Sequence, residues 1–386
     1  MENFVFHADT EVFFGKNQIT NLPNILNRYG KNVLLSYGGG SIKRNGIYDK
    51  IYELLKDFNI VELAGIEPNP RIGTVKKGIE LCKENHIDVI LAIGGGSTID
   101  CSKLVAAGAF YDENPWDLVK DSSKITNALP IVSILTLAAT GSEMNSNAVI
   151  SNPETNEKLG VHSKYFQPKV SILDPEYTYS LPTIQTAAGT ADIMSHVIEQ
   201  YFNSTAGTYI QDKFCEGILE TCIKYCHVAL QSPTDYEARA NLMWASSMAL
   251  NGICGSGKNG GWSCHPIEHE LSAFYDITHG VGLAIVTPHW MRYILSEKTV
   301  DKFVSYAINV WHVEESDDKF EVAEKGIKAT EEFFKSCGIP MNLGKLGIDD
   351  SLIEKMAAAV IKHKDLSDAY VPLNEADITE ILRKSL

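Results

Sequence analysis

The sequence predicts a two-domain protein, with an α/β domain built on a mostly parallel sheet over residues 1–180 and an all-helical domain over residues 181–386. Three observations lead to this prediction. A chain of 386 residues exceeds what one hydrophobic core normally covers. Short apolar runs alternate with helical patterns before residue 180, and the strand patterns disappear after it. The composition, with 44% hydrophobic and 22% charged residues, is typical of a soluble globular protein.

The strands of the first domain are predicted from apolar runs rich in β-branched residues: NVLLSY, IVELAG, DVILAI, PIVSILTL and KVSILD. Helical patterns follow the first three runs and extend to about Phe58, Asn85 and Ala109. Strands that alternate with helices of this length form βαβ crossovers, which make neighbouring strands parallel. Beyond residue 180, amphipathic segments such as DKFCEGILETCIKYCHVAL and DYEARANLMWASSMALNG predict helices.

Charge and composition exclude several classes of partner. The chain has 34 Lys and Arg against 49 Asp and Glu, and the net charge of -15 should repel a nucleic-acid backbone. The first residues, MENFVFHADTEVFFG, lack the basic region and the apolar core of a signal peptide, and no apolar run approaches the length of a membrane span. The 8 cysteines are scattered, without a CxxC pair. We therefore expect a cytoplasmic protein with reduced thiols and neither a membrane nor a nucleic-acid partner.

Two nearly identical glycine loops follow predicted strands of the first domain. Gly38–Ser41 follows NVLLSY, and Gly94–Ser97 follows DVILAI. Glycines let a backbone approach a ligand closely, and a helix N-terminus attracts anions, so a phosphate fits such a loop. Neither loop is the GxGxxG fingerprint, and either one alone could be a tight strand-to-helix turn. Their recurrence in consecutive units favours phosphate binding, and LTLAATGSEMN, residues 135–145, adds a hydroxyl-bearing loop after another strand.

The second domain contains a polar group of residues with helical spacing. Asp192 and His196 are four residues apart, as are His265 and His269, and His279 follows ten residues later. Side chains with that spacing project from one face of a helix. Each pair alone could form an intrahelical hydrogen bond or pack in a core. Together, one carboxylate and several imidazoles form a ligand set that suits Fe²⁺ or Zn²⁺.

The motifs GGGSTIDCSK, LAATGSEMN, DPEYTYSLP, AGTADIMSHVIEQY and CHPIEHELSAFYDITHGVGLAIVTP resemble those of the iron-containing alcohol dehydrogenase family, specifically its butanol dehydrogenase-like branch. The resemblance extends from about residue 10 to about residue 300, followed by a typical helical tail. It implies a Rossmann-like first domain, a helical second domain, and a divalent metal beside a nicotinamide cofactor. The metal ligands that it implies are Asp192, His196, His265 and His279, whereas His269 falls on a catalytic position near substrate and nicotinamide.

The same resemblance implies a set of cofactor contacts in the first domain. These contacts fall on Gly38, Gly39, Gly40, Ser41, Asn69, Gly95, Gly96, Ser97, Thr98, Thr136, Leu137, Thr140, Asn147, Lys158 and Tyr177. The first glycine loop offers no carboxylate that would repel a ribose 2′-phosphate, and Lys43 and Arg44 follow it closely. We therefore expect NADP(H) to be favoured over NAD(H).

The activity that follows is hydride transfer between NAD(P)H and a short-chain aliphatic aldehyde such as butanal, because a divalent cation polarises a carbonyl and the nicotinamide carries the hydride. A glycerol dehydrogenase-like polyol oxidoreductase would share this chemistry. A dehydroquinate synthase-like lyase would need a basic anion pocket, and no Lys/Arg cluster lies around the ligand motifs. A regulatory nucleotide binder would not need all four ligands. The stretch FVFHADTEVFFG could pair strands between two copies, so we expect a homodimer.

Overall fold

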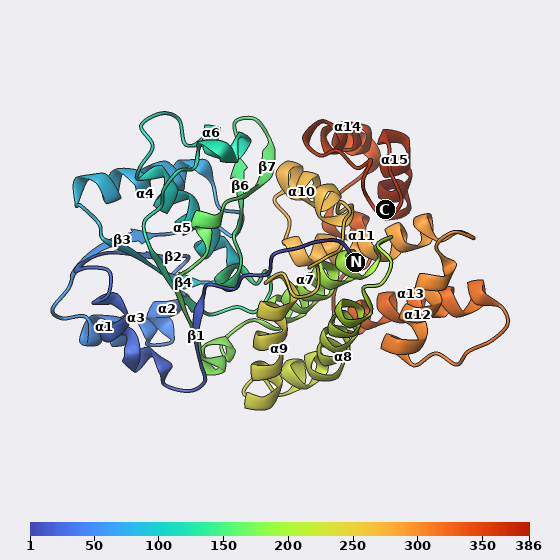
Figure 1. Cartoon of the computed structure of the whole chain (residues 1–386), viewed down its shortest axis with the longest axis horizontal. Helices are drawn as coiled ribbons and strands as arrows, with labels where there is room; N and C mark the ends of the chain where they lie inside the picture. Colours follow the sequence, from blue (N-terminus) through green and yellow to red (C-terminus); the bar gives the residue numbers. More distant parts are fainter. The chain divides into compact units, whose positions relative to one another are not determined.

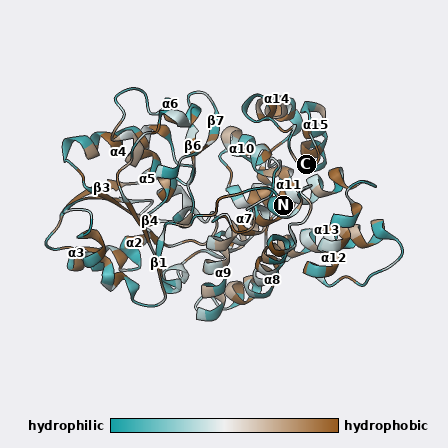
Figure 2. Ribbon diagram, in the orientation of Figure 1, coloured by the Kyte–Doolittle hydropathy of each residue, from teal (hydrophilic) through white to brown (hydrophobic).

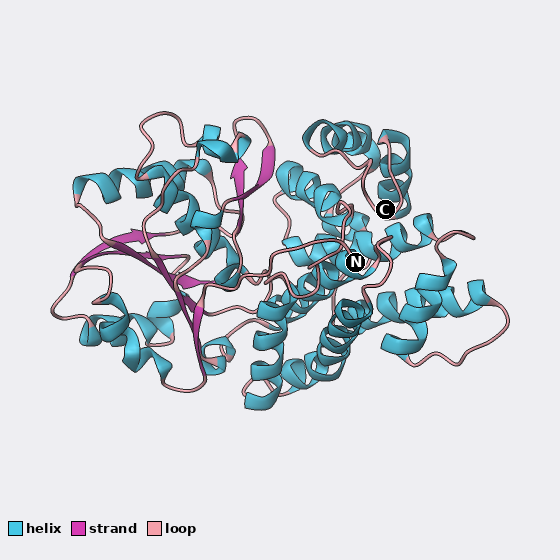
Figure 3. Ribbon diagram, viewed as in Figure 1, coloured by secondary structure: helices cyan, strands magenta, loops and turns pink.

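The computed structural model describes all 386 residues, which form two compact units (Figure 1). The α/β unit consists of His7–Leu181 and Thr234–Ser247. The helical unit consists of Met1–Phe6, Pro182–Pro233 and Met248–Leu386. All strands belong to the α/β unit, as the magenta arrows in Figure 3 show. We propose that the chain divides into domains after residue 180.

The α/β unit is built on a six-stranded parallel sheet with the strand order β1-β8-β5-β4-β2-β3. An antiparallel hairpin of β6 and β7 lies outside this sheet. The prediction of a parallel α/β fold followed by helices is therefore confirmed. The strands are β1 (Glu11–Phe14), β2 (Asn32–Tyr37), β3 (Asn59–Ala64), β4 (Val89–Gly94), β5 (Ile131–Leu135), β6 (Asn147–Asn152), β7 (Glu157–His162) and β8 (Val170–Leu173).

The central strands read as continuous apolar runs because both faces of the sheet are covered. In β2, Val33 and Leu35 belong to one buried cluster, whereas Leu34 between them belongs to the other. Figure 1 shows the helices responsible, with α1 (Leu22–Leu26), α2 (Ser41–Arg44) and α3 (Ile47–Leu54) on one face of the sheet. On the opposite face lie α4 (Ile72–Glu84), α5 (Gly96–Gly108) and α6 (Trp116–Lys120). Figure 2 shows the matching band of hydrophobic residues along the middle strands.

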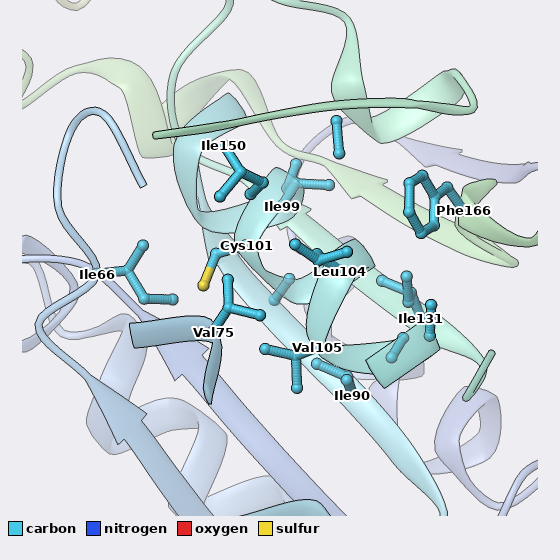
Figure 4. Packing of buried hydrophobic residues seen from close by; sticks show 14 of the residues in the cluster. Ile66, Val75, Ile90, Ile99, Cys101, Leu104, Val105, Ile131, Ile150 and Phe166 are labelled. Atoms are coloured by element: carbon cyan, nitrogen blue, oxygen red, sulfur yellow. The ribbon is translucent and has the colours of Figure 1, made fainter. Parts of the chain in front are cut away.

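Helix α5 (Gly96–Gly108) is the central helix of the second face, and nearly all of its residues are buried. Figure 4 shows how its side chains meet those of the sheet. The helix contributes Ile99, Leu104 and Val105 to a cluster that includes Ile90 and Ile131 of the strands β4 and β5. This packing holds the N-terminus of α5 directly after β4, which ends at Gly94.

The helical pattern after β2 is divided in two. Helix α2 ends at Arg44 and α3 begins at Ile47, because Gly46 between them has a φ of +80°, a left-handed conformation that glycine adopts without strain. The helices of the α/β unit are α1 (Leu22–Leu26), α2 (Ser41–Arg44), α3 (Ile47–Leu54), α4 (Ile72–Glu84), α5, α6 (Trp116–Lys120) and most of α9 (Tyr236–Ala249).

The helical unit is organised around α7, whose residues are buried almost continuously from Thr186 to Tyr201. Helices α8 and α11 pack on α7, and α10 packs on α11. The helices of this unit are α7 (Thr183–Tyr201), α8 (Tyr209–Gln231), α10 (Cys264–Tyr275), α11 (His279–Ile294), α12 (Val300–Trp311), α13 (Lys319–Ser336), α14 (Ile353–His363) and α15 (Glu375–Lys384). None of the helices in the chain combines the length and the apolar character that crossing a membrane requires.

Candidate metal centre and nucleotide loops

Three helices of the helical unit direct polar side chains toward Asp192 Oδ1. Asp192 and His196 lie one turn apart on α7, and His196 Nδ1 is 3.3 Å from Asp192 Oδ1. His265 on α10 and His279 at the start of α11 place their Nε2 atoms 3.8 Å and 3.7 Å from the same oxygen. The ligand atoms of Asp192, His265 and His279 lie within 4.8 Å of one another. The ring of His196 is 4.4 Å from the ring of His265.

The polar atoms of this cluster fit a divalent cation. Asp192 Oδ1, His196 Nδ1 and His265 Nε2 are buried without a hydrogen-bond partner. Each such atom costs about 1–3 kcal/mol if nothing binds it, so three of them around one point need a common partner. The donors that the structure groups are one carboxylate and the two imidazoles of His265 and His279, and His196, beside Asp192, would add a third imidazole to a set that suits Fe²⁺ or Zn²⁺.

Burial and charge act together on the titration of these groups. Burial raises the pKa of Asp192, but electrostatic interactions with the surrounding imidazoles of His196, His279 and His265 outweigh burial and hold the pKa of that carboxyl below its usual range. Burial lowers the pKa of His196 to about 3, which leaves a neutral imidazole at pH 7. Burial also lowers the pKa of His265, yet the nearby carboxylates of Asp192 and Glu199 raise it to about 9.

His269 lies beside the cluster around Asp192. It follows His265 by one turn of α10, and the ring centroids of these two residues are 6.5 Å apart. Its ring is 5.6 Å from that of His279. His269 groups with Glu268 and His279 and not with Asp192. This position differs from that of the other two motif histidines, His265 and His279.

Two carboxylates of this region were not predicted from the sequence. Glu199 on α7 contacts His265 Nδ1, and Glu268 on α10 contacts His279 Nδ1. Glu268 lies inside the histidine motif HPIEHE, and this position could have indicated its role from the sequence. Glu199 follows His196 by three residues on the same helix, but nothing in the sequence joins it to His265.

In the α/β unit, the structure brings three predicted cofactor loops together. Gly38–Ser41 follows β2, Gly95–Thr98 opens α5, and Thr136–Thr140 follows β5. Strands β2, β4 and β5 are neighbours in the parallel sheet, so their carboxyl ends lie at one edge. A Cβ atom at Gly38 would lie 3.9 Å from Thr98 Oγ1, and one at Gly96 would lie 2.3 Å from Thr140 Oγ1.

The other predicted cofactor residues lie around these loops or on the sheet. The Ser97 hydroxyl donates to the carbonyl of Pro68, the residue before Asn69. Lys158 is paired with Ser151 in the β6–β7 hairpin, and the Ser151 N–H donates to the carbonyl of Pro70 over 2.8 Å. Asn147 begins β6. Tyr177 follows β8 and packs against the buried cluster on the α1–α3 face of the sheet.

A buried lysine that the sequence did not single out links these loops. Lys103 on α5 is fully buried, and its Nζ donates to Ser142 Oγ over 2.7 Å and to the carbonyl of Asn147 over 2.7 Å. Ser142 Oγ donates in turn to Asp100 Oδ1. Burial lowers the pKa of Lys103 to about 8. The network joins α5 to the segment that follows Thr140.

Comparisons with known proteins agree with this arrangement. Residues 9–175 match the family model for iron-containing alcohol dehydrogenase, and residues 186–386 match the C-terminal model of the Fe-containing alcohol dehydrogenase family. NADH-dependent butanol dehydrogenase A of Clostridium acetobutylicum is 57% identical, with 100% of both chains covered. NADPH-dependent aldehyde reductase YqhD of Escherichia coli is 40% identical over 94% of each chain.

A solved structure shows the same fold over the whole chain. The crystal structure of NADH-dependent butanol dehydrogenase A from Thermotoga maritima superimposes with a TM-score of 0.95 at 41% identity, and the match covers 100% of this chain and 99% of that one. Both family models, the full-length relatives and this structural neighbour point to one family. The chain therefore belongs to the iron-containing alcohol dehydrogenase family, in its butanol dehydrogenase-like branch.

Proposed function

We propose that this chain is a metal-dependent alcohol dehydrogenase or aldehyde reductase that transfers a hydride between NAD(P)H and short-chain aliphatic aldehydes such as butanal. The observation that carries the proposal is the convergence of His265 and His279 on the carboxylate of Asp192, with His196 beside it and buried polar atoms left without partners. Family membership supports the reaction class, and relatives named butanol dehydrogenase and aldehyde reductase support the substrate class.

Four side chains of the helical unit would hold the cation: Asp192, His196, His265 and His279. A bound Fe²⁺ or Zn²⁺ supplies positive charge that polarises a carbonyl, and the nicotinamide carries the hydride. Asp192, His196 and His265 are buried and His279 is partly buried, which limits the access of water to these positions. For hydride transfer, the reacting carbons of the nicotinamide and the substrate must come within about 3–3.5 Å of each other.

His269 is the proposed catalytic residue. Reduction of an aldehyde requires a proton for the substrate oxygen as well as a hydride for the carbon. An imidazole is the side chain best suited to pass a proton near neutral pH, and one ring nitrogen of His269 would deliver it. Its place one turn from His265 and beside His279 supports this role or a role in orienting the nicotinamide.

NADP(H) is the cofactor that the first glycine loop favours in this proposal. A Cβ atom at Gly39 or Gly40 would meet nothing within 4 Å, so the loop has room beside it for a phosphate. The carboxylate of Glu62 on the adjacent strand β3 accepts hydrogen bonds from Tyr37 and Tyr48. These hydrogen bonds already occupy both of its oxygens. The relatives are divided, because the butanol dehydrogenases are named as NADH-dependent and the aldehyde reductase as NADPH-dependent.

A cytoplasmic homodimer is part of the same proposal. Strand β1 (Glu11–Phe14) is the edge of the six-stranded sheet and pairs only with β8 within the chain, so its outer edge offers free backbone groups to a second copy. All 8 cysteines are buried free thiols, which supports a reducing compartment.

Rates of turnover test the proposal. Purified protein, stripped of metal and then reconstituted with Fe²⁺ or Zn²⁺, would be assayed with NADPH and with NADH against butanal, glyceraldehyde and a charged aldehyde. We expect metal-dependent reduction of butanal to be the fastest reaction and NADPH to be the better cofactor. Absence of any metal-dependent turnover would overturn the reaction class. Faster turnover of glyceraldehyde would favour a polyol oxidoreductase, and faster turnover with NADH would overturn the cofactor preference.

A further inference from the structure

Two buried carboxylates lie behind the proposed histidine ligands. Glu199 Oε2 contacts Nδ1 of His265, and Glu268 Oε2 contacts Nδ1 of His279. Both carboxylates are almost completely buried. Each contact uses the Nδ1 atom of its imidazole, whereas the Nε2 atoms of both rings lie on the side of Asp192 Oδ1, at 3.8 Å and 3.7 Å.

Glu199 is held firmly because it also caps helix α10. One of its oxygens accepts from the backbone N–H groups of Ser263 and Cys264, and the other accepts from the backbone N–H of His265 over 3.0 Å. These groups are the unpaired donors at the N-terminus of α10, where a negative charge is favoured. A single carboxylate on α7 therefore sets both the start of α10 and the orientation of the first histidine on it.

Glu268 is held by close packing between α10 and α11. Its carboxylate also accepts from the hydroxyl of Ser272, one turn further along α10. A Cβ atom at Gly282 would lie 2.8 Å from Glu268 Cγ, and one at Gly280 would lie 2.0 Å from the carbonyl oxygen of Ala188 on α7. Gly282 therefore lets α11 approach α10 closely at Glu268, and Gly280 lets α11 approach α7 closely.

We infer that Glu199 and Glu268 are positioning residues that set the metal affinity of the chain. A neutral imidazole carries one N–H, and an ionised carboxylate can only accept a hydrogen bond. Each glutamate therefore keeps the proton on Nδ1 and leaves the Nε2 lone pair for the cation. The inference rests on the proposed metal site, and it names two residues that act on that site through its ligands.

Glu270 provides a matched control on the same helix. It is buried like Glu268, and its Oε1 lies 2.8 Å from Nδ1 of His363 on α14. His363 is not among the proposed ligands. The substitution Glu270→Gln therefore removes the charge of a buried glutamate that contacts a histidine in α14, without altering the contacts behind His265 or His279.

The experiment measures the Zn²⁺ affinity of the full-length protein by competition with a chromogenic chelator. The variants are Glu199→Gln, Glu268→Gln and the control Glu270→Gln, each first stripped of metal and checked for folding by circular dichroism and thermal unfolding. Glu199→Gln keeps an oxygen that can accept from the backbone at the start of α10. We expect Glu199→Gln and Glu268→Gln to bind Zn²⁺ roughly 10- to 100-fold more weakly than the parent chain. The control should remain within about threefold of the parent, because the ligand contacts are unchanged.

The outcomes separate this inference from the proposed function. Parent-like affinity in both test variants would overturn the inference while leaving the metal site in place. An equal loss in Glu270→Gln would also overturn it, because the loss would then reflect general packing. If the parent binds no Zn²⁺, or if Asp192→Ala binds as tightly as the parent, the proposed metal site itself fails. If Glu199→Gln does not fold, Glu268→Gln decides alone.

Discussion

The proposed metal centre and the proposed nucleotide loops use opposite kinds of construction. In the helical unit, the site consists of side-chain atoms: a carboxylate oxygen of Asp192 and the imidazole nitrogens of His265 and His279 meet within 4.8 Å. In the α/β unit, the corresponding features are stretches of backbone that contain glycine and lie at one edge of the sheet. A single substitution should therefore abolish binding at a site made of side chains. At a site made of backbone, a single substitution should weaken binding only partly, and for one ligand more than for another.

The two glycine loops differ further from each other, although both read GGGS. In the first loop, a Cβ atom at Gly39 or Gly40 would meet nothing within 4 Å, and the helix that follows has 4 residues. In the second loop, a Cβ atom at Gly94 or Gly96 would lie 2.3 Å from the hydroxyl oxygen of Thr98 or Thr140, and the loop opens a 13-residue helix. The same four letters therefore indicate open space in one place and close packing in the other.

Removal of a histidine ligand should produce the largest effect. We expect His265→Ala and His279→Ala to lose bound metal and to lower turnover of butanal by roughly 10³-fold or more, because each removes a ligand of the cation that stabilises the reacting charge. Metal analysis and steady-state rates on the purified variants check this. A variant that keeps full metal and turnover would show that the helical site does not depend on single side chains.

Replacement of His269 tests whether a histidine beside the proposed ligands acts without binding the metal. His269→Ala should keep its metal and still bind cofactor, yet lower turnover by about 10²–10⁴-fold, because it removes a proton-transfer group and not a ligand. Rates over a range of pH should show an altered profile relative to the parent. Loss of metal as complete as in His265→Ala would make His269 a ligand, and parent-like rates at every pH would leave it as a packed residue.

A charge introduced into the first loop should act selectively. Gly39→Asp should weaken NADPH binding by roughly 10- to 100-fold and change NADH binding much less, because a carboxylate repels the 2′-phosphate that only NADPH carries. Dissociation constants from the quenching of protein fluorescence would show the difference. Equal weakening of both cofactors would mean that this loop does not contact the adenosine end.

Addition of a methyl group should distinguish the two loops by stability. Gly96→Ala places a Cβ atom 2.3 Å from Thr140 Oγ1 and should destabilise the protein by about 1–3 kcal/mol. Gly39→Ala has open space and should unfold at nearly the parent temperature. Thermal unfolding of both variants makes the comparison. Equal unfolding temperatures of Gly96→Ala and Gly39→Ala would contradict the packing role of the second loop.

Much of the fold could be predicted because the central strands are buried on both faces and therefore read as apolar runs. The run NVLLSY coincides with β2, Asn32–Tyr37. Strand β1, with 4 residues at the edge of the sheet, and the β6–β7 hairpin give no comparable signal, since their residues alternate between exposed and buried or are only partly covered. The break at Gly46 depends on a backbone conformation that periodicity does not reveal.

The residues of the candidate site could be predicted only where they are close in the sequence and have the spacing of one helix face. Asp192 and His196 are recognisable from their spacing on one helix. The contact between Glu199 and His265 joins residues 66 positions apart, and the buried ammonium of Lys103 reaches acceptors 39 to 44 positions away. Such contacts depend on how helices pack, so a single sequence does not specify them.

The most direct measurement is that of metal content and turnover in Asp192→Ala and His196→Ala. Both residues lie on α7 and are proposed to hold the divalent cation on which hydride transfer depends. The measurement is elemental analysis for iron and zinc on the purified parent and variants, together with the rate of butanal reduction after reconstitution with each metal. We expect both variants to lose metal and activity together. Full metal occupancy in both variants, or parent-like turnover without metal, would contradict it.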